Sequence, residues 1–67
     1  MEQNLYFIQF IDTEEMETYE ITRTSNSREH LIKEANAVAR NYNLHGYGID
    51  KVRIFSADKK LLISYNL

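Results

Sequence analysis

The segment of residues 5–11, Leu-Tyr-Phe-Ile-Gln-Phe-Ile, most constrains how this chain folds. It is rich in β-forming residues and apolar at nearly every position, which is typical of a strand covered on both sides. Such a strand belongs in the interior of a sheet. Because 67 residues leave room for one hydrophobic core, we predict a single α+β domain over residues 1–67, built around this strand.

The rest of the chain supplies three further strands and a helix. Residues 16–23 alternate apolar and polar positions, and the polar stretch 12–15 before them predicts a hairpin. Residues 49–55 and 61–67 predict two more strands joined by a turn at 56–60. The order ββαββ predicts a four-stranded, mainly antiparallel sheet with one helix packed on one face. The strand order 2-1-3-4 places the apolar first strand inside that sheet.

The predicted helix lies between the two pairs of strands. Asn26 is placed to cap its start, and Glu29 three residues later completes a capping box. Gly46 and Gly48 predict a helix end near Tyr42. The apolar side of the helix is expected to carry Leu31, Ala35, Val38, Ala39 and Tyr42, and the polar side Lys33, Asn36 and Arg40.

Strand alternation divides the predicted sheet into two faces. The face under the helix is expected to carry Tyr6, Ile8, Phe10, Tyr19, Ile21, Val52, Ile54, Ile63 and Tyr65. The other face, called the open face below, is expected to carry Leu5, Phe7, Ile11, Lys51, Arg53, Phe55 and Leu62. One helix cannot cover both faces. The open face, with apolar and basic residues interleaved, is therefore the best candidate interaction surface.

The residue types present argue against catalysis and against metal or cofactor binding. Cysteine is absent, no serine lies in a nucleophile motif, and two histidines are the available bases. His30 and Glu34 share one side of the helix, but zinc requires three or four ligands. An acidic cluster near the first turn lacks the glycine of a calcium-binding loop; it consists of Asp12, Glu14, Glu15 and Glu17. We expect a non-enzymatic protein without cofactor or metal.

Aromatic and basic residues on the open face predict a partner-binding function. Phe7, Lys51, Arg53 and Phe55 form a combination that protein interfaces and single-strand nucleic-acid binders share. The net charge is −2, and residues 1–20 contain six acidic residues and no basic one, which opposes phosphate binding. We therefore favour a protein partner. Single-stranded nucleic acid remains one alternative, and a homodimer formed through the open face or an edge strand remains another.

Two features of the composition predict where the protein works. The absence of cysteine fits a reducing compartment. No apolar run approaches the roughly 20 residues that a membrane-spanning helix needs. The sequence thus predicts a cytoplasmic protein with no membrane partner.

The layout resembles that of small phage-encoded inhibitors, including some anti-CRISPR proteins and a small phage inhibitor of bacterial RNA polymerase. The resemblance covers most of the chain and comprises the hairpin, the Ala35/Val38/Ala39 helix side, the His45-Gly46 stop, Val52-Arg53-Ile54 and Leu61-Leu62-Ile63-Ser64-Tyr65. It is a resemblance of fold-level features.

The resemblance implies a stoichiometric inhibitor that holds a host or defence protein, such as a CRISPR effector, in the host cytoplasm. Lys33 and Arg40 on the helix and Lys51 and Arg53 on the sheet match the basic contact positions of such proteins. The acidic first hairpin departs from the pattern. It is suited to a basic, nucleic-acid-binding groove on the target.

Overall fold

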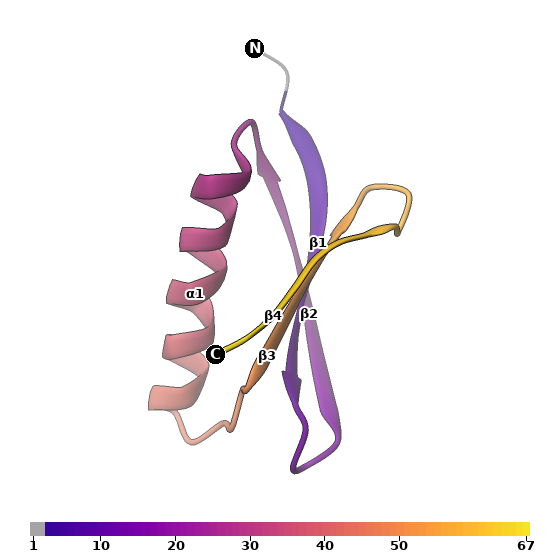
Figure 1. Cartoon of the computed structure of the whole chain (residues 1–67). Coiled ribbons are helices and arrows are strands. Elements are labelled where there is room, and N and C mark those ends of the chain that lie inside the picture. Colours follow the sequence, from indigo (N-terminus) through magenta and orange to yellow (C-terminus); the bar gives the residue numbers. More distant parts are fainter. Residues whose placement is uncertain (1–2) are drawn as a thin grey trace.

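The computed structural model describes residues 3–67 as a four-stranded sheet with a helix lying across one face (Figure 1). The elements are β1 (Asn4–Asp12), β2 (Glu17–Ser25), α1 (Arg28–Leu44), β3 (Lys51–Ser56) and β4 (Leu61–Asn66). Neighbouring strands are antiparallel throughout, in the order β2-β1-β3-β4. The predicted α+β class, the ββαββ order and the strand order are confirmed.

The core lies between α1 and the face of the sheet that the helix covers. Alternate residues of the two central strands are fully buried there: Ile8, Phe10, Val52 and Ile54. The helix contributes Leu31, Ala35 and Ala39, which are also fully buried. The two alanines let the helix backbone come close to the large side chains of the strands. The predicted helix-covered face is confirmed at its centre, while its outer members on β2 and β4 are half-buried.

The N-cap of the helix lies one residue later than predicted. Ser27 is the N-cap, and its Oγ accepts a hydrogen bond from the His30 amide at 3.3 Å. Ser25, the last residue of β2, turns the chain into the helix, since its Oγ accepts a hydrogen bond from Ser27 N at 3.1 Å. The prediction that Asn26 caps the helix is wrong, because the Ser25–Ser27 turn places Ser27 at the cap position.

The helix also ends later than predicted, at Leu44 instead of Tyr42. Asn43 stays helical, and its side chain brackets the backbone of Ile49 with bonds of 2.7 Å and 3.1 Å. The chain then reverses at Gly46, whose φ of 94° lies in the left-handed region that favours glycine. Within residues 3–67, no helix is long and apolar enough to cross a bilayer.

A β-bulge between β3 and β4 changes which leucine belongs to the open face. Ile54 pairs with Ile63, but Phe55 pairs with Leu61, so Leu62 is the extra residue. Leu62 packs against the core, whereas Leu61 is 54% exposed. The prediction that Leu62 lies on the open face is wrong, because strict alternation assumes a ladder without a bulge.

One residue of the predicted polar side of the helix contacts the sheet. The Tyr65 hydroxyl of β4 donates a hydrogen bond to Asn36 Oδ1 at 2.7 Å, and Asn36 is half-buried. Lys33 and Arg40 are exposed, as predicted. The prediction for Asn36 is wrong, because the helix is narrower than the sheet and meets the β4 side chains along its flank.

Candidate partner-binding surface

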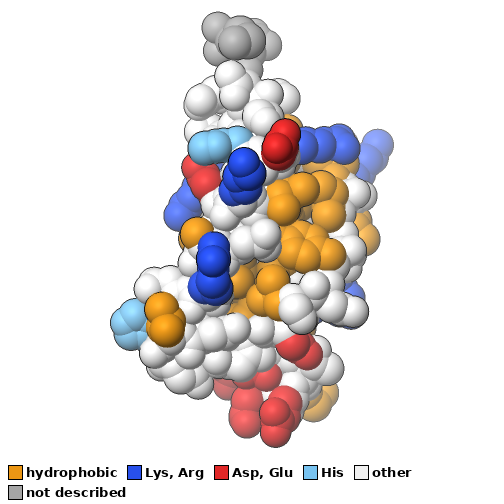
Figure 2. Space-filling model, turned by 60° about the vertical axis from the view of Figure 1, so that its left-hand side comes forward, with side chains coloured by type: hydrophobic (Ala, Val, Ile, Leu, Met, Phe, Trp, Pro, Cys, Tyr) orange, Lys and Arg blue, Asp and Glu red, His pale blue; other side chains and the backbone are white. Residues whose placement is uncertain are grey.

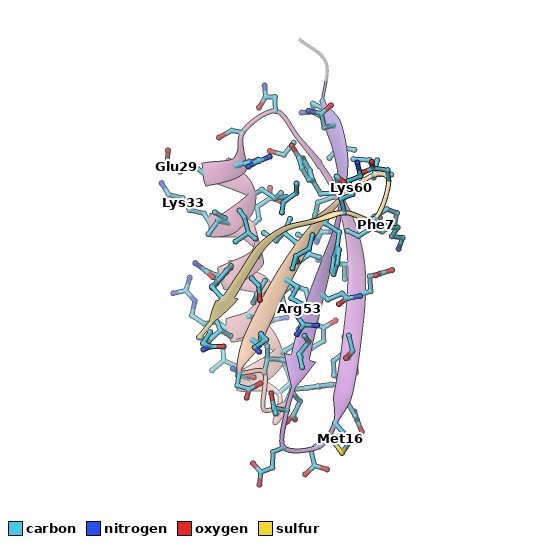
Figure 3. All side chains as sticks on the ribbon, turned by 45° about the vertical axis from the view of Figure 1, so that its right-hand side comes forward. Phe7, Met16, Glu29, Lys33, Arg53 and Lys60 are labelled. Atoms are coloured by element: carbon cyan, nitrogen blue, oxygen red, sulfur yellow. The ribbon has the colours of Figure 1, made fainter. Side chains whose placement is uncertain are left out.

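Four of the six predicted contact residues lie together on the open face, on the two central strands. Phe7 of β1 pairs with Phe55 of β3, and the next positions place Arg53 and Lys51 beside other residues of β1. The other two, Lys33 and Arg40, lie on α1, which packs on the opposite face. Figure 3 shows Lys33 and Phe7 on opposite sides of the molecule. The six residues are therefore divided between two surfaces.

An apolar row crosses the middle of the open face. Phe7 and Phe55 are half-buried, and Leu61 follows them on β4. Leu5, two residues before Phe7 on the same side of β1, is 40% exposed. Cross-strand aromatic pairs of this kind stabilise a sheet by a few tenths to about 1 kcal/mol. They also leave apolar surface in contact with solvent.

Lys59, from the turn between β3 and β4, lies over the Phe7 ring. Its ammonium nitrogen is 3.5 Å from the ring centroid and 3.4 Å from Glu20 Oε2 on β2. Gln9 Nε2 donates a hydrogen bond to the other oxygen of Glu20 at 3.3 Å. One side of the Phe7 ring is thus covered by a cation. The residue pattern did not predict this contact, although the predicted strand order places the basic 56–60 turn near the start of the first strand.

A shallow groove lies on the open face beside the β1–β2 turn. Ile11, Thr18 and Met16 line it together with the cationic side chains of Lys51 and Arg53. Met16 is 90% exposed at the turn. Asp12 and Thr13 complete the lining, so the groove combines two apolar residues with two positive charges and one buried carboxylate.

The acidic residues of the first hairpin have separate structural roles. Glu14 and Glu15 are exposed at the turn, whereas Asp12 is buried. The Asp12 carboxylate accepts hydrogen bonds from Glu15 N at 3.1 Å and Gly48 N at 3.2 Å, so it joins the turn to the segment before β3. A Cβ atom on Gly48 would lie 3.0 Å from Asp12 Oδ2, which explains the glycine there. Asp12 thus differs from the other members of the acidic cluster, which are exposed.

The same end of the molecule has a second carboxylate with backbone and side-chain partners. Thr13 donates to Asp50 Oδ1 from its hydroxyl at 2.9 Å and from its amide at 3.1 Å. These two bonds hold the pKa of Asp50 below its usual value. On the face that Figure 2 draws, acidic side chains gather at this end, and Lys and Arg side chains lie toward the other end together with further acidic ones.

Three tyrosines form a cluster where the end of α1 meets β2. The ring centroids of Tyr19, Tyr42 and Tyr47 lie 5.1–5.4 Å apart, and Phe10 of the core adjoins Tyr42. The Tyr19 hydroxyl donates to the Glu17 carboxylate, and this bond raises the pKa of Tyr19 to about 12. The rings are in contact with one another and leave no space for a ligand between them. We assign this cluster a structural role.

The helical pair His30 and Glu34 lies on the surface. His30 Nε2 is 3.3 Å from Glu34 Oε1, and Arg23 Nε of β2 is 3.7 Å from the other oxygen of the same carboxylate. Among residues 3–67 the structure contains no group of three or more His, Cys, Asp or Glu side chains placed to hold a metal ion.

Comparison of the chain with protein-family models, with curated proteins and with solved structures finds no match.

Proposed function

We propose that this chain is a non-enzymatic protein-binding module that contacts its partner through the open face. The observation that carries the proposal is the Phe7–Phe55 pair, which lies half-buried on the two central strands of the sheet, on the side opposite α1. Arg53 lies in the next row of the same face. Aromatic residues and arginine near the centre of a patch are the residue types that dominate binding energy in protein interfaces.

Charges on the open face favour a protein over a nucleic acid. Glu20 lies within this face and holds Lys59 against the Phe7 ring, where a base would have to stack. The acidic β1–β2 turn lies next to the groove that contains Lys51 and Arg53. A phosphate backbone following that groove would approach these carboxylates, which weakens binding.

Single-stranded nucleic acid is the second candidate, and one observation favours it. Phe7 and Phe55 are neighbours on the two central strands, with Arg53 and Lys51 in the two rows beyond. Sheet-mounted aromatic rings beside basic side chains form the stacking platform of several single-strand binders. In this case Lys59 has to leave the Phe7 ring when a base binds.

The target that we propose is a bacterial nucleic-acid-handling complex, such as a CRISPR effector, which the chain inhibits in the host cytoplasm. Two features support this narrower proposal. The layout resembles that of phage-encoded inhibitors, and exposed carboxylates are concentrated at the β1–β2 turn, in Glu14 and Glu15. An acidic end of this kind is complementary to a groove that normally holds nucleic acid.

The test is a capture experiment with the pure domain as bait in a nuclease-treated lysate of the source organism. Phe55→Ala serves as the test variant, and Asn41→Ala at an exposed position on the helix serves as the matched control. We expect one protein in stoichiometric amount with the wild type and with Asn41→Ala, and at least a tenfold smaller amount with Phe55→Ala. Binding should survive moderate salt, because apolar contacts are not screened.

Two outcomes would contradict the proposal. Equal capture of the partner by Phe55→Ala and by the wild type would show that the open face is not part of the contact. Recovery of nucleic acid alone when nuclease is omitted, with binding that weakens steeply as salt rises, would favour the stacking platform instead.

A further inference from the structure

The two edge strands of the sheet differ in how well they resist pairing with another strand. β2 carries Glu17, Glu20 and Arg23, and charged side chains are a common protection of exposed edges. β4 has the sequence Leu-Leu-Ile-Ser-Tyr-Asn from Leu61 to Asn66, with no charged residue and no proline. The bulge at its start is the remaining protection, and it restricts a new pairing to about residues 62–66.

Backbone groups at the middle of β4 point away from β3. Leu67 N donates to Asp50 O at 3.0 Å, so the pair between these residues, Lys51 and Asn66, is a non-hydrogen-bonded pair of the antiparallel ladder. Such pairs alternate with hydrogen-bonded ones, so Tyr65 and Ile63 direct their amides and carbonyls toward β3. The amide and carbonyl of Ser64 therefore face outward at the edge.

Side chains beside this edge form an apolar strip that α1 covers incompletely. Ile63 and Tyr65 of β4 are half-buried, as are Ile32 of the helix and Leu62 of the bulge. Figure 2 shows hydrophobic side chains gathered next to the helix on this side. A strand added to β4 would extend the helix-covered face and cover part of this strip.

We propose that a second copy of this chain pairs with β4 in antiparallel fashion, with the two-fold axis at Ser64. In this register Ile63 of each copy lies opposite Tyr65 of the other on the helix side, and Ser64 lies opposite Ser64 on the open-face side. Apolar residues thus meet apolar residues, and a small hydroxyl meets a small hydroxyl. The result is a continuous eight-stranded sheet.

The occupant is a second copy because β4 is complementary to itself. Pairing the strand with its own sequence creates no like-charge contact, since residues 61–66 carry no charge. The nearest cation along the strand, Lys60, would lie about 27 Å from Lys60 of the second copy, at about 3.4 Å per residue. That separation exceeds the screening length of about 8 Å at physiological salt.

Sedimentation equilibrium over a concentration series tests the proposal. We expect the wild type to reach twice the 8.0 kDa mass of the chain. Ser64→Lys and Ser64→Asp place like charges against each other at the axis, and each should raise the dimer dissociation constant at least about tenfold. Mixing these two variants should restore a dimer, because Lys then faces Asp. Thr24→Lys, at an exposed position on β2, is the matched control and should dimerise like the wild type.

Ser64 is exposed in the single chain, so each variant should fold. Circular dichroism checks this for each variant. Two outcomes overturn the proposal. A wild-type chain that stays monomeric throughout would leave the edge free for a strand of another protein. A dimer that tolerates Ser64→Lys would use another surface, such as the open face, which Phe55→Ala then identifies.

Discussion

The two faces of the sheet share the same central strands but differ in how deeply their side chains are buried. On β1, Ile8 and Phe10 are fully buried under the helix, while Phe7 and Gln9 lie half-exposed on the other side. Within residues 3–67, nine residues form the buried apolar core, and they belong to the helix, to the helix-covered face or, like Ile49, to the segment before β3. Stability therefore comes mainly from one face. Substitutions on the other face should therefore cost less stability than substitutions in the core.

The sharpest test of this difference is Phe10→Ala. Removing a fully buried phenylalanine from a packed core costs about 3–5 kcal/mol. A core of this size supplies roughly 3–5 kcal/mol in total, so we expect the variant to be largely unfolded at 25 °C. Urea denaturation followed by circular dichroism measures this. An unchanged unfolding midpoint would mean that the helix-covered face does not dominate stability.

A smaller loss is expected for Asp12→Ala, at the end of the helix-covered face. The substitution leaves the amides of Glu15 and Gly48 without their carboxylate acceptor, which should cost about 1–3 kcal/mol. Glu14→Ala, in the exposed turn two residues away, is the control and should change stability by less than about 0.5 kcal/mol. Similar losses for both variants would show that Asp12 is no more structural than its neighbours.

Phe55→Ala on the open face is expected to reduce stability by about 1 kcal/mol, since it removes a half-buried cross-strand aromatic pair. Partner binding should be lost at the same time. Thermal unfolding and the capture experiment together measure the two effects. If Phe55→Ala unfolds the chain as Phe10→Ala does, the two faces contribute equally to stability, contrary to the difference described above.

Lys59→Met tests the contact that covers Phe7. Exposed cation–π pairs and surface ion pairs each contribute roughly 0.5–1 kcal/mol or less, so stability should fall by less than about 1 kcal/mol. The control is Lys60→Met. The Lys60 ammonium lies on the surface, 3.8 Å from the Asp58 carboxylate. If Phe7 is a stacking site that Lys59 blocks, Lys59→Met should strengthen binding of single-stranded oligonucleotides. No gain would argue against the nucleic-acid candidate.

The smallest effect concerns the titration of Tyr19. Glu17→Gln removes the carboxylate that raises the pKa of Tyr19 to about 12, so the pKa should move toward 10. Because the folded pKa is the higher one, the stabilisation by this bond is present below pH 10 and is lost as the pH rises toward 12. Ultraviolet absorbance of tyrosinate follows the titration, with Glu14→Gln as the control. If Glu17→Gln leaves the titration of Tyr19 unchanged, the Glu17 carboxylate is not the cause of the raised pKa.

The composition of the candidate site was predictable in part. Alternation along residues 5–11 and 49–55 placed Phe7, Arg53 and Phe55 on one face, and the apolar first strand indicated its central position. Lys59 on the Phe7 ring was not predictable in this way, because the contact joins residues 52 positions apart through the curvature of a turn. The separation of Lys33 and Arg40 from the sheet residues follows from which face the helix covers.

The sequence by itself determined the order of the elements, the residues under the helix and the strand order, because side-chain period and strand burial are local patterns of polarity. Tertiary structure decided the bulge that packs Leu62 against the core, the burial of Asp12 and the outward amide of Ser64. Each of these depends on the geometry of segments that are distant in the chain or on the register of two strands. A single strand or helix pattern carries no information about either.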